Sequence, residues 1–201
     1  MTALILASAS PRRAELLTQI GLSFRVQPAN IDETPTEAEP ARAYVERMAR
    51  EKARAVAAQN PDDLVLVSDT SVVLDGHILG KPESDQQARD TLDRLSGATH
   101  QVMTAVALAR GESCDTVVSV TDVTFRDLPD DEIAAYVDTG EPADKAGSYG
   151  IQGRGGIFVS ELKGSYSAVV GLPLQETADL LARAGYPVWQ GWPGGSKENG
   201  T

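Results

Sequence analysis

Two long stretches of β-branched and other apolar residues constrain the fold of this chain most strongly. They run from Thr99 to Arg110 and from Cys114 to Leu128, and a turn around Gly111 separates them. This pattern predicts two long antiparallel strands. A second hairpin is predicted where Asp75-Gly76 stands between two short apolar runs, because Asp-Gly favours a two-residue turn. We therefore expect a sheet with a substantial antiparallel part.

The N-terminal segments alternate between strand and helix. Residues 3–7 predict a short buried strand, and residues 24–29 predict a second strand. Between them, Ser10 suits a helix N-cap and Pro11 a first helical residue. Further helices are predicted over residues 41–59, 84–97, 129–140 and 174–185. The sequence thus predicts an α/β fold with parallel and antiparallel strands, without the regular alternation of a doubly wound domain.

Length and composition predict one domain over residues 1–190, and the aperiodic residues 191–201 predict a disordered tail. The single cysteine, Cys114, excludes an internal disulfide framework and favours a reducing compartment. No apolar run approaches the ~20 residues that a membrane-spanning helix needs. We therefore expect a cytoplasmic protein that is not inserted in a membrane.

The net charge of −11 limits the class of partner. Nucleic acids and anionic membranes bind largely through Lys and Arg, so neither is expected as a partner. A small polyanion needs only a local cluster of cations. Arg12 and Arg13 supply such a pair, because they fall in the first turn of the predicted helix, where unpaired N–H groups favour phosphate. The alternative is that both are solvated surface arginines.

Two acidic positions could carry chemistry. Asp69 is predicted at the C-terminal end of a buried strand, the edge where α/β sheets gather functional groups. It could hold a metal or deprotonate water, or it could simply form a turn. Asp32 and Glu33 lie in a proline-rich loop and could supply a metal ligand or only loop polarity.

Other polar residues are ambiguous when taken singly. Lys52, Lys81 and Lys145 could each be a solvated charge, and the sequence around Lys81 is no Walker motif. Gln152 lies in a glycine-rich segment, and its amide could read the edge of a nucleobase.

Taken together and in order, several motifs resemble the Maf family of nucleotide pyrophosphatases. They are LILASASPRRAELL, IDET, YVERMAREKA, SDTSVVLDGHILGKP, LSGATHQVMTAVAL, EIAAYVDTGEPADKAGSYGIQG and GSYSAVVGLPL. The resemblance implies an elongated mixed sheet with flanking helices and two lobes around a central cleft, similar to the inosine-triphosphate pyrophosphatases. It also implies metal-dependent hydrolysis of a nucleoside triphosphate to the monophosphate and pyrophosphate, by a homodimer.

The resemblance assigns a role to each candidate residue. Asp69 matches the catalytic acidic residue, which could act as base, as metal ligand or as both. Positions that set base preference match Arg12, Thr70 and Gln152, and their pattern resembles the subgroup acting on dTTP and UTP. Polar positions lining the family's cleft match Ser8, Arg13, Glu33, Lys52, Lys81 and Lys145.

From these assignments we expect the triphosphate over the helix start at Arg12 and Arg13. A Mg²⁺ or Mn²⁺ ion would lie between its phosphates and the carboxylates of Asp69 and Glu33. This chain has Ser68 and Ser71 where the family commonly has Ala and Val, which could reshape the pocket slightly. The competing hypothesis is a regulator of cell division or septum formation that binds nucleotide without turnover.

Overall fold

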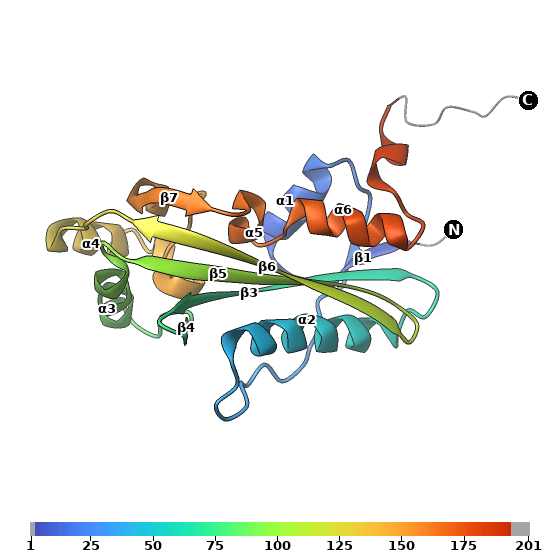
Figure 1. Ribbon diagram of the computed structural model, residues 1–201, viewed down its shortest axis with the longest axis horizontal. Coiled ribbons are helices and arrows are strands. Elements are labelled where there is room, and N and C mark those ends of the chain that lie inside the picture. Colours follow the sequence, from blue (N-terminus) through green and yellow to red (C-terminus); the bar gives the residue numbers. More distant parts are fainter. Residues whose placement is uncertain (1–2, 194–201) are drawn as a thin grey trace, which may run out of the picture.

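Seven strands form one mixed sheet along the long axis of the molecule (Figure 1). The structure is a computed structural model that describes residues 3–193. The strands are β1 (Leu4–Leu6), β2 (Arg25–Val26), β3 (Leu64–Leu74), β4 (His77–Leu79), β5 (Thr99–Arg110), β6 (Ser113–Phe125) and β7 (Val159–Lys163). Their order is β2-β1-β3-β5-β6-β7, with β4 paired to β3. The strands β2, β1 and β3 are parallel and the other pairings are antiparallel, which confirms the predicted mixed sheet.

Helices cover both faces of this sheet (Figure 1). They are α1 (Pro11–Gln19), α2 (Ala41–Ala57), α3 (Asp85–Leu95), α4 (Asp130–Val137), α5 (Tyr166–Val170) and α6 (Leu174–Arg183). Helix α2 lies on one face, whereas α1, α5 and α6 lie on the opposite face. Helices α3 and α4 lie together at one end of the long axis. Within residues 3–193, no helix combines the length and apolarity required to cross a bilayer.

The two faces of β3 pack into different parts of the core. Leu64 and Leu66 join a cluster with α1 and α6, and Val65 and Val67 join a cluster with α2. This division follows from the alternation of side chains along a strand, and both faces are buried because helices cover both. Alanines at positions 49, 53 and 57 let α2 approach the sheet closely.

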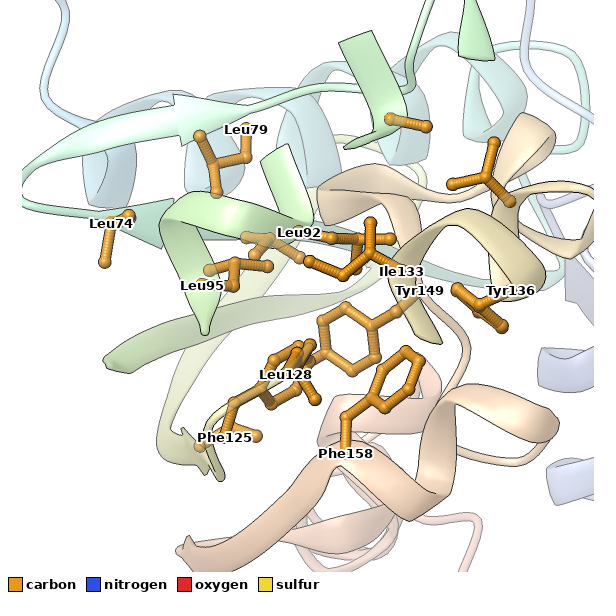
Figure 2. Close-up of a cluster of buried hydrophobic side chains, with 14 of the residues drawn as sticks. Leu74, Leu79, Leu92, Leu95, Phe125, Leu128, Ile133, Tyr136, Tyr149 and Phe158 are labelled. Atoms are coloured by element: carbon orange, nitrogen blue, oxygen red, sulfur yellow. The ribbon is translucent and has the colours of Figure 1, made fainter. Parts of the chain in front are cut away.

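A third apolar cluster fills the end of the molecule beneath α3 and α4. Figure 2 shows Leu92 and Leu95 of α3 near the rings of Phe125, Tyr149 and Phe158. The rings of Phe125 and Tyr149 meet edge to face, with centroids 4.7 Å apart. This cluster and the α1–α6 cluster form two separate cores, and Ile151 contacts both.

Local sequence predicts most element boundaries, with three differences. The predicted strand over residues 24–29 is only Arg25–Val26, because β1 ends at Leu6, whose carbonyl accepts a last hydrogen bond from the amide of Gln27. The sequence predicts that the glycine-rich segment before α6 is a loop leading into a strand over residues 156–162, and the structure adds α5 and several 3₁₀ turns to it. The Asp75-Gly76 hairpin is confirmed, with both residues at positive φ.

The third difference concerns β3 itself. The prediction that this strand ends at Asp69 is wrong, because β3 continues without a break to Leu74. Its pairing with β5 runs from Val65 to Val73, so Asp69 lies in the middle of a paired strand.

The end of the described chain contacts the end of α1. Trp192 donates a hydrogen bond from Nε1 to the carbonyl of Ile20, 2.7 Å away, at the end of α1. Of the predicted tail, residues 194–201 lie outside the described residues. The domain boundary at residue 190 stays a prediction.

Candidate active site

The described residues enclose one large cleft, of about 600 Å³. Its walls come from the β1–α1 loop, the middle of β3, the segment after β4 and the glycine-rich segment before β7. All ten residues to which the family resemblance gives a role line this cleft: Ser8, Arg12, Arg13, Glu33, Lys52, Asp69, Thr70, Lys81, Lys145 and Gln152. Asp32, the other acid of the proline-rich loop, does not line it and accepts hydrogen bonds from Thr34. They come from segments far apart in the chain, so the structure brings together what the sequence only suggested.

A gap in the sheet exposes Asp69 to the cleft. Strand β1 pairs with β3 only as far as Leu66, and β4 begins to pair at Val72. Residues 67–71 therefore have β5 on one side and no strand on the other. Asp69 is thus placed just beyond the carboxyl end of its parallel neighbour β1, which is where functional side chains gather in α/β sheets. Asp69 therefore faces the cleft from the middle of β3, and not from the predicted strand end.

Lys52 pairs with two carboxylates of the cleft. Its Nζ lies 2.8 Å from Asp69 Oδ1 and 2.8 Å from Glu33 Oε2. The side chains of Lys52 and Asp69 are only 13% and 12% exposed, whereas that of Glu33 is 55% exposed. Burial acts to lower the pKa of Lys52, but the two carboxylates hold it above its usual value. The ammonium group therefore stays charged and offsets the repulsion between the two acids.

Two neighbouring residues position these carboxylates. Tyr44 donates its hydroxyl to the carbonyl of Glu33, 2.8 Å away, and so ties the acidic loop to α2. Thr70 and Thr104 lie with their hydroxyl oxygens 3.1 Å apart, which links β3 to β5 beside Asp69. Neither Tyr44 nor Thr104 was predicted as a site residue. A tyrosine and a threonine in apolar segments carry no local signal that would distinguish them from core residues.

Arg13 donates hydrogen bonds to three separate segments around the cleft. Its Nε donates to the carbonyl of Gly171 at 2.9 Å, Nη1 to Ser8 Oγ at 3.1 Å and Nη2 to Thr70 Oγ1 at 3.3 Å. Burial lowers the pKa of Arg13, while the charge of Asp69 opposes that effect. Three of the five guanidinium N–H groups are used in this way, and two remain for a ligand.

The first turn of α1 also lines the cleft, and its backbone N–H groups at Arg12 and Arg13 have no partner within residues 3–193. Ser10 occupies the predicted N-cap position, but its hydroxyl makes no capping hydrogen bond. The amides of Arg12 and Arg13 precede the first helical hydrogen bond, from Ala14 N to the carbonyl of Ser10. The side chain of Arg12 has no hydrogen-bond partner anywhere in residues 3–193. These groups could bind an anion in the cleft.

Lys81, Lys145 and Gln152 line the same cleft. Lys145 Nζ donates to the carbonyl of Glu141 at 3.0 Å and to Asp144 Oδ1 at 2.7 Å. Gln152 is exposed at a tight turn. Lys81 is exposed immediately after β4. The cleft therefore collects five cations and three carboxylates in a chain whose net charge is −11.

The carboxylate oxygens of the cleft suit a metal ion that binds together with the phosphates of a substrate. Nowhere in the described part of the chain do three His, Cys, Asp or Glu side chains gather as a metal site. Asp69 and Glu33 each use one oxygen for Lys52, and their second oxygens accept no hydrogen bond from residues 3–193. Mg²⁺ is commonly held by one or two carboxylates together with substrate phosphates. Two carboxylates with free oxygens fit that arrangement.

The chain is similar in sequence to known proteins. The sequence profile of the family described as Maf-like protein matches residues 3–184. A dTTP/UTP pyrophosphatase from Anaeromyxobacter dehalogenans is 56% identical over 193 residues, which cover 93% of this chain and 97% of that protein. A dTTP/UTP pyrophosphatase from Escherichia coli O157:H7 is 56% identical over 183 residues, which cover 90% of this chain and 93% of that protein.

A solved structure also resembles this one. The HAM1 protein from Coxiella burnetii superposes with a TM-score of 0.52 at 16% identity, covering 91% of this chain and all of that one. At this identity the likeness concerns the fold alone. It confirms the expected mixed α/β fold.

Proposed function

The chain belongs to the Maf family, and from this premise we propose that it hydrolyses dTTP and UTP to the monophosphate and pyrophosphate. Such an enzyme is a hydrolase that cuts between the α- and β-phosphates. Relatives that are more than half identical over nearly the whole chain carry this name. The observation that supports it best is the cleft, where five cations and three carboxylates face one space.

The cations of the cleft bind the triphosphate. Arg12 and the amides at the start of α1 are free to contact phosphate oxygens, and Arg13 keeps two N–H groups for the same purpose. Lys52, Lys81 and Lys145 supply further positive charge. Negative charge grows on the pyrophosphate as it leaves, so fixed cations stabilise the transition state more than the bound substrate.

Asp69 accepts a proton from the water that attacks the α-phosphorus. Lys52 orients the carboxylate by donating a hydrogen bond to Oδ1, and Oδ2 is then available to accept the proton of the water. Arg13 and Thr104 hold Thr70, the next residue along β3, and so restrict where the carboxylate can lie.

Asp69 and Glu33 would also hold a divalent cation, Mg²⁺ or Mn²⁺, together with phosphate oxygens of the substrate. Bound there, the cation would neutralise phosphate charge. The free second oxygen of each carboxylate supports this assignment.

Gln152, Arg12 and Thr70 set the base preference. The amide of Gln152 can donate and accept, as the O4 and N3 edge of uracil or thymine requires. Leu79, Val102 and Tyr149 also line the cleft and supply apolar surface against which a base can pack.

The enzyme is proposed to be a homodimer that acts in the cytoplasm, in agreement with the family resemblance and the single cysteine. Light scattering on the purified full chain tests the dimer by its mass.

A nucleotide panel with product identification tests the activity. The purified chain is incubated with dTTP, UTP, CTP, dGTP or ATP, with Mg²⁺, Mn²⁺ or a chelator, and phosphate and pyrophosphate are quantified separately. We expect pyrophosphate from dTTP and UTP, in the presence of metal. Release of orthophosphate would indicate a phosphatase instead. Tight nucleotide binding without any product would favour the regulator hypothesis.

A further inference from the structure

We propose that Glu141 is a positioning residue for base selection. Its carboxylate, together with the hydroxyl of Tyr136, holds the turn that presents Gln152 to the cleft. The inference rests on the function proposed above, because base selection presupposes a nucleotide in the cleft. It adds to that function a residue outside the set that the sequence analysis identified.

Gln152 stands at the tip of a closed turn. The amide of Gly153 donates to the carbonyl of Gly150 at 3.1 Å, so Gly150 to Gly153 form one tight turn with Gln152 as its third residue. The turn itself lines the cleft. The amide group of Gln152 makes no hydrogen bond within residues 3–193, so the backbone of the turn decides where it points.

Glu141 and Tyr136 hold both ends of this turn. Glu141 Oε2 accepts from the amide of Arg154 at 3.0 Å, and Oε1 accepts from the amide of Gly155 at 3.1 Å. The Tyr136 hydroxyl donates to Glu141 Oε1 at 2.9 Å and accepts from the amide of Gly150 at 3.2 Å. The residues before and after Gln152 are therefore fixed through one carboxylate–phenol pair.

The glycines of the turn fit this arrangement closely. A Cβ at Gly153 would collide with the Glu141 carboxylate, and a Cβ at Gly155 would lie 2.8 Å from the Tyr136 hydroxyl oxygen. A Cβ at Gly150 would lie 2.7 Å from the Lys145 side chain. The absence of side chains lets the backbone approach Glu141, which explains why the segment needs so many glycines.

The carboxylate of Glu141 is charged and mostly buried. Its side chain is 13% exposed. Burial acts to raise the pKa of Glu141, but the amides of Arg154 and Gly155 and the Tyr136 hydroxyl hold it below its usual value. Hydrogen bonds to a charged acceptor are stronger than neutral ones, so the turn is held firmly. The backbone of Glu141 also accepts from Lys145, so the same residue steadies a second side chain of the cleft.

The test compares base discrimination in four variants. Glu141→Gln places an NH₂ donor against backbone amides, and Tyr136→Phe removes only the hydroxyl while keeping the ring beside Phe158. Gln152→Ala removes the side chain that the turn presents. Glu161→Gln is the control, because this exposed carboxylate on β7 pairs with Lys163 and with no other charged side chain of residues 3–193. For each, kcat/KM is measured for dTTP and dGTP, and dissociation constants are measured for their α,β-imido analogues.

We expect Glu141→Gln and Tyr136→Phe to lower the preference for the thymine nucleotide by about tenfold, the size of one lost polar contact. The loss should arise in KM, with kcat changed less than about threefold. Amide exchange at Arg154 and Gly155 should become faster. Because Glu141 acts through Gln152, adding Glu141→Gln to Gln152→Ala should change the preference by less than about twofold.

Two results would overturn the inference. In one, amide exchange accelerates but the base preference stays at the wild-type value, which is what a merely structural role predicts. In the other, the effects of Glu141→Gln and Gln152→Ala multiply in the double variant. Absence of pyrophosphate release by the wild-type chain would reject the proposed function instead. The binding constants of the analogues would still decide the role of Glu141.

Discussion

Lys52 determines how charge is arranged at the centre of the cleft. It lies between Asp69 and Glu33 at 2.8 Å from each, and its side chain is nearly as buried as that of Asp69. A buried carboxylate without a partner would be costly, so the ammonium lets an acid stand beside bound phosphates. The same residue therefore stabilises the fold and prepares the site.

Replacing Asp69 by Asn should remove turnover and keep the fold. Asparagine has nearly the same shape but cannot take a proton, and a general base contributes about 10²- to 10⁴-fold. We expect kcat for dTTP to decrease by a factor within that range, and the circular dichroism spectrum to stay unchanged. Asp138→Asn is the matched control, because Asp138 is an exposed residue paired with Arg89. Turnover near the wild-type rate in Asp69→Asn would remove this residue from the mechanism.

His100 is buried as a neutral side chain behind the cleft wall. Its Nε2 lies 2.7 Å from the hydroxyl oxygen of Tyr149, and its ring meets that of Phe125 edge to face. Burial lowers the pKa of His100 to about 4. The unfolded chain takes up a proton at His100 near pH 6.5, whereas the folded chain does so only near pH 4. Folding stability is therefore complete above pH 6.5 and decreases as the pH falls toward 4.

This linkage predicts a loss of about 2 kcal/mol in the free energy of unfolding between pH 7 and pH 5. Urea unfolding at both pH values measures it. The carboxylates with lowered pKa values, such as Glu39 at about 2, lose their contribution only at lower pH. His100→Gln should therefore abolish most of the loss. His77→Gln, at an exposed histidine of the hairpin, should retain it. An equal loss in both variants would contradict the assignment.

At the scale of elements, two helices with similar sequence signals begin differently. Helix α3 follows Ser84, whose Oγ accepts from the amide of Gln87 at 3.2 Å. Helix α1 follows Ser10, whose hydroxyl makes no such bond, and the first turn carries two arginines in place of acids. At the start of α3, a side chain of the same segment accepts a hydrogen bond from a backbone N–H group of the first turn. At the start of α1, the backbone N–H groups have no such acceptor and can donate to a ligand in the cleft.

The difference can be measured by removing each hydroxyl. Ser84→Ala should lower the free energy of unfolding by about 1 kcal/mol, the typical value of an N-cap. Ser10→Ala should lower it by less than about 0.5 kcal/mol, because no capping bond is lost. Both values come from denaturant unfolding in the absence of nucleotide. Equal losses would show that Ser10 does cap α1 in solution.

The sequence indicated these elements to different degrees. Helix α3 and the Asp75-Gly76 hairpin follow from local signals, and both are confirmed. The length of β3 does not follow from such signals, because the polar residues 68–71 resemble a turn. They remain extended because β5 pairs with them along one edge while the other edge faces the cleft. Local preference is overridden by pairing with a strand more than thirty residues away.

At the scale of the molecule, the cleft joins two apolar cores. Its walls include Val102 and Tyr149 from the α3–α4 end and Val170 from the α1–α6 end. Five cations gather in this cleft although the chain carries a net charge of −11. A nucleoside triphosphate bound here would contact cleft residues next to both cores, and its phosphates would neutralise the charge of the five cations.

Bound nucleotide should therefore stabilise the whole molecule. With the α,β-imido analogue of dTTP at about 100 times its dissociation constant, the free energy of unfolding should rise by about 2.7 kcal/mol. Denaturant unfolding with and without the analogue measures this increase. Thymidine at the same concentration should stabilise much less, because it lacks phosphates. Equal stabilisation by both ligands would show that the cations contribute little to binding.

The amino-acid sequence alone was enough to predict most local elements, the mixed fold, the family and ten of the residues that line the cleft. Runs of apolar residues, helix caps and the Asp-Gly turn act over a few neighbours, so they can be read along the chain. Only the tertiary structure placed Lys52 between Glu33 and Asp69, and Glu141 against the amides of Arg154 and Gly155. These contacts depend on the relative positions of separate elements, which packing sets and no short stretch of sequence encodes.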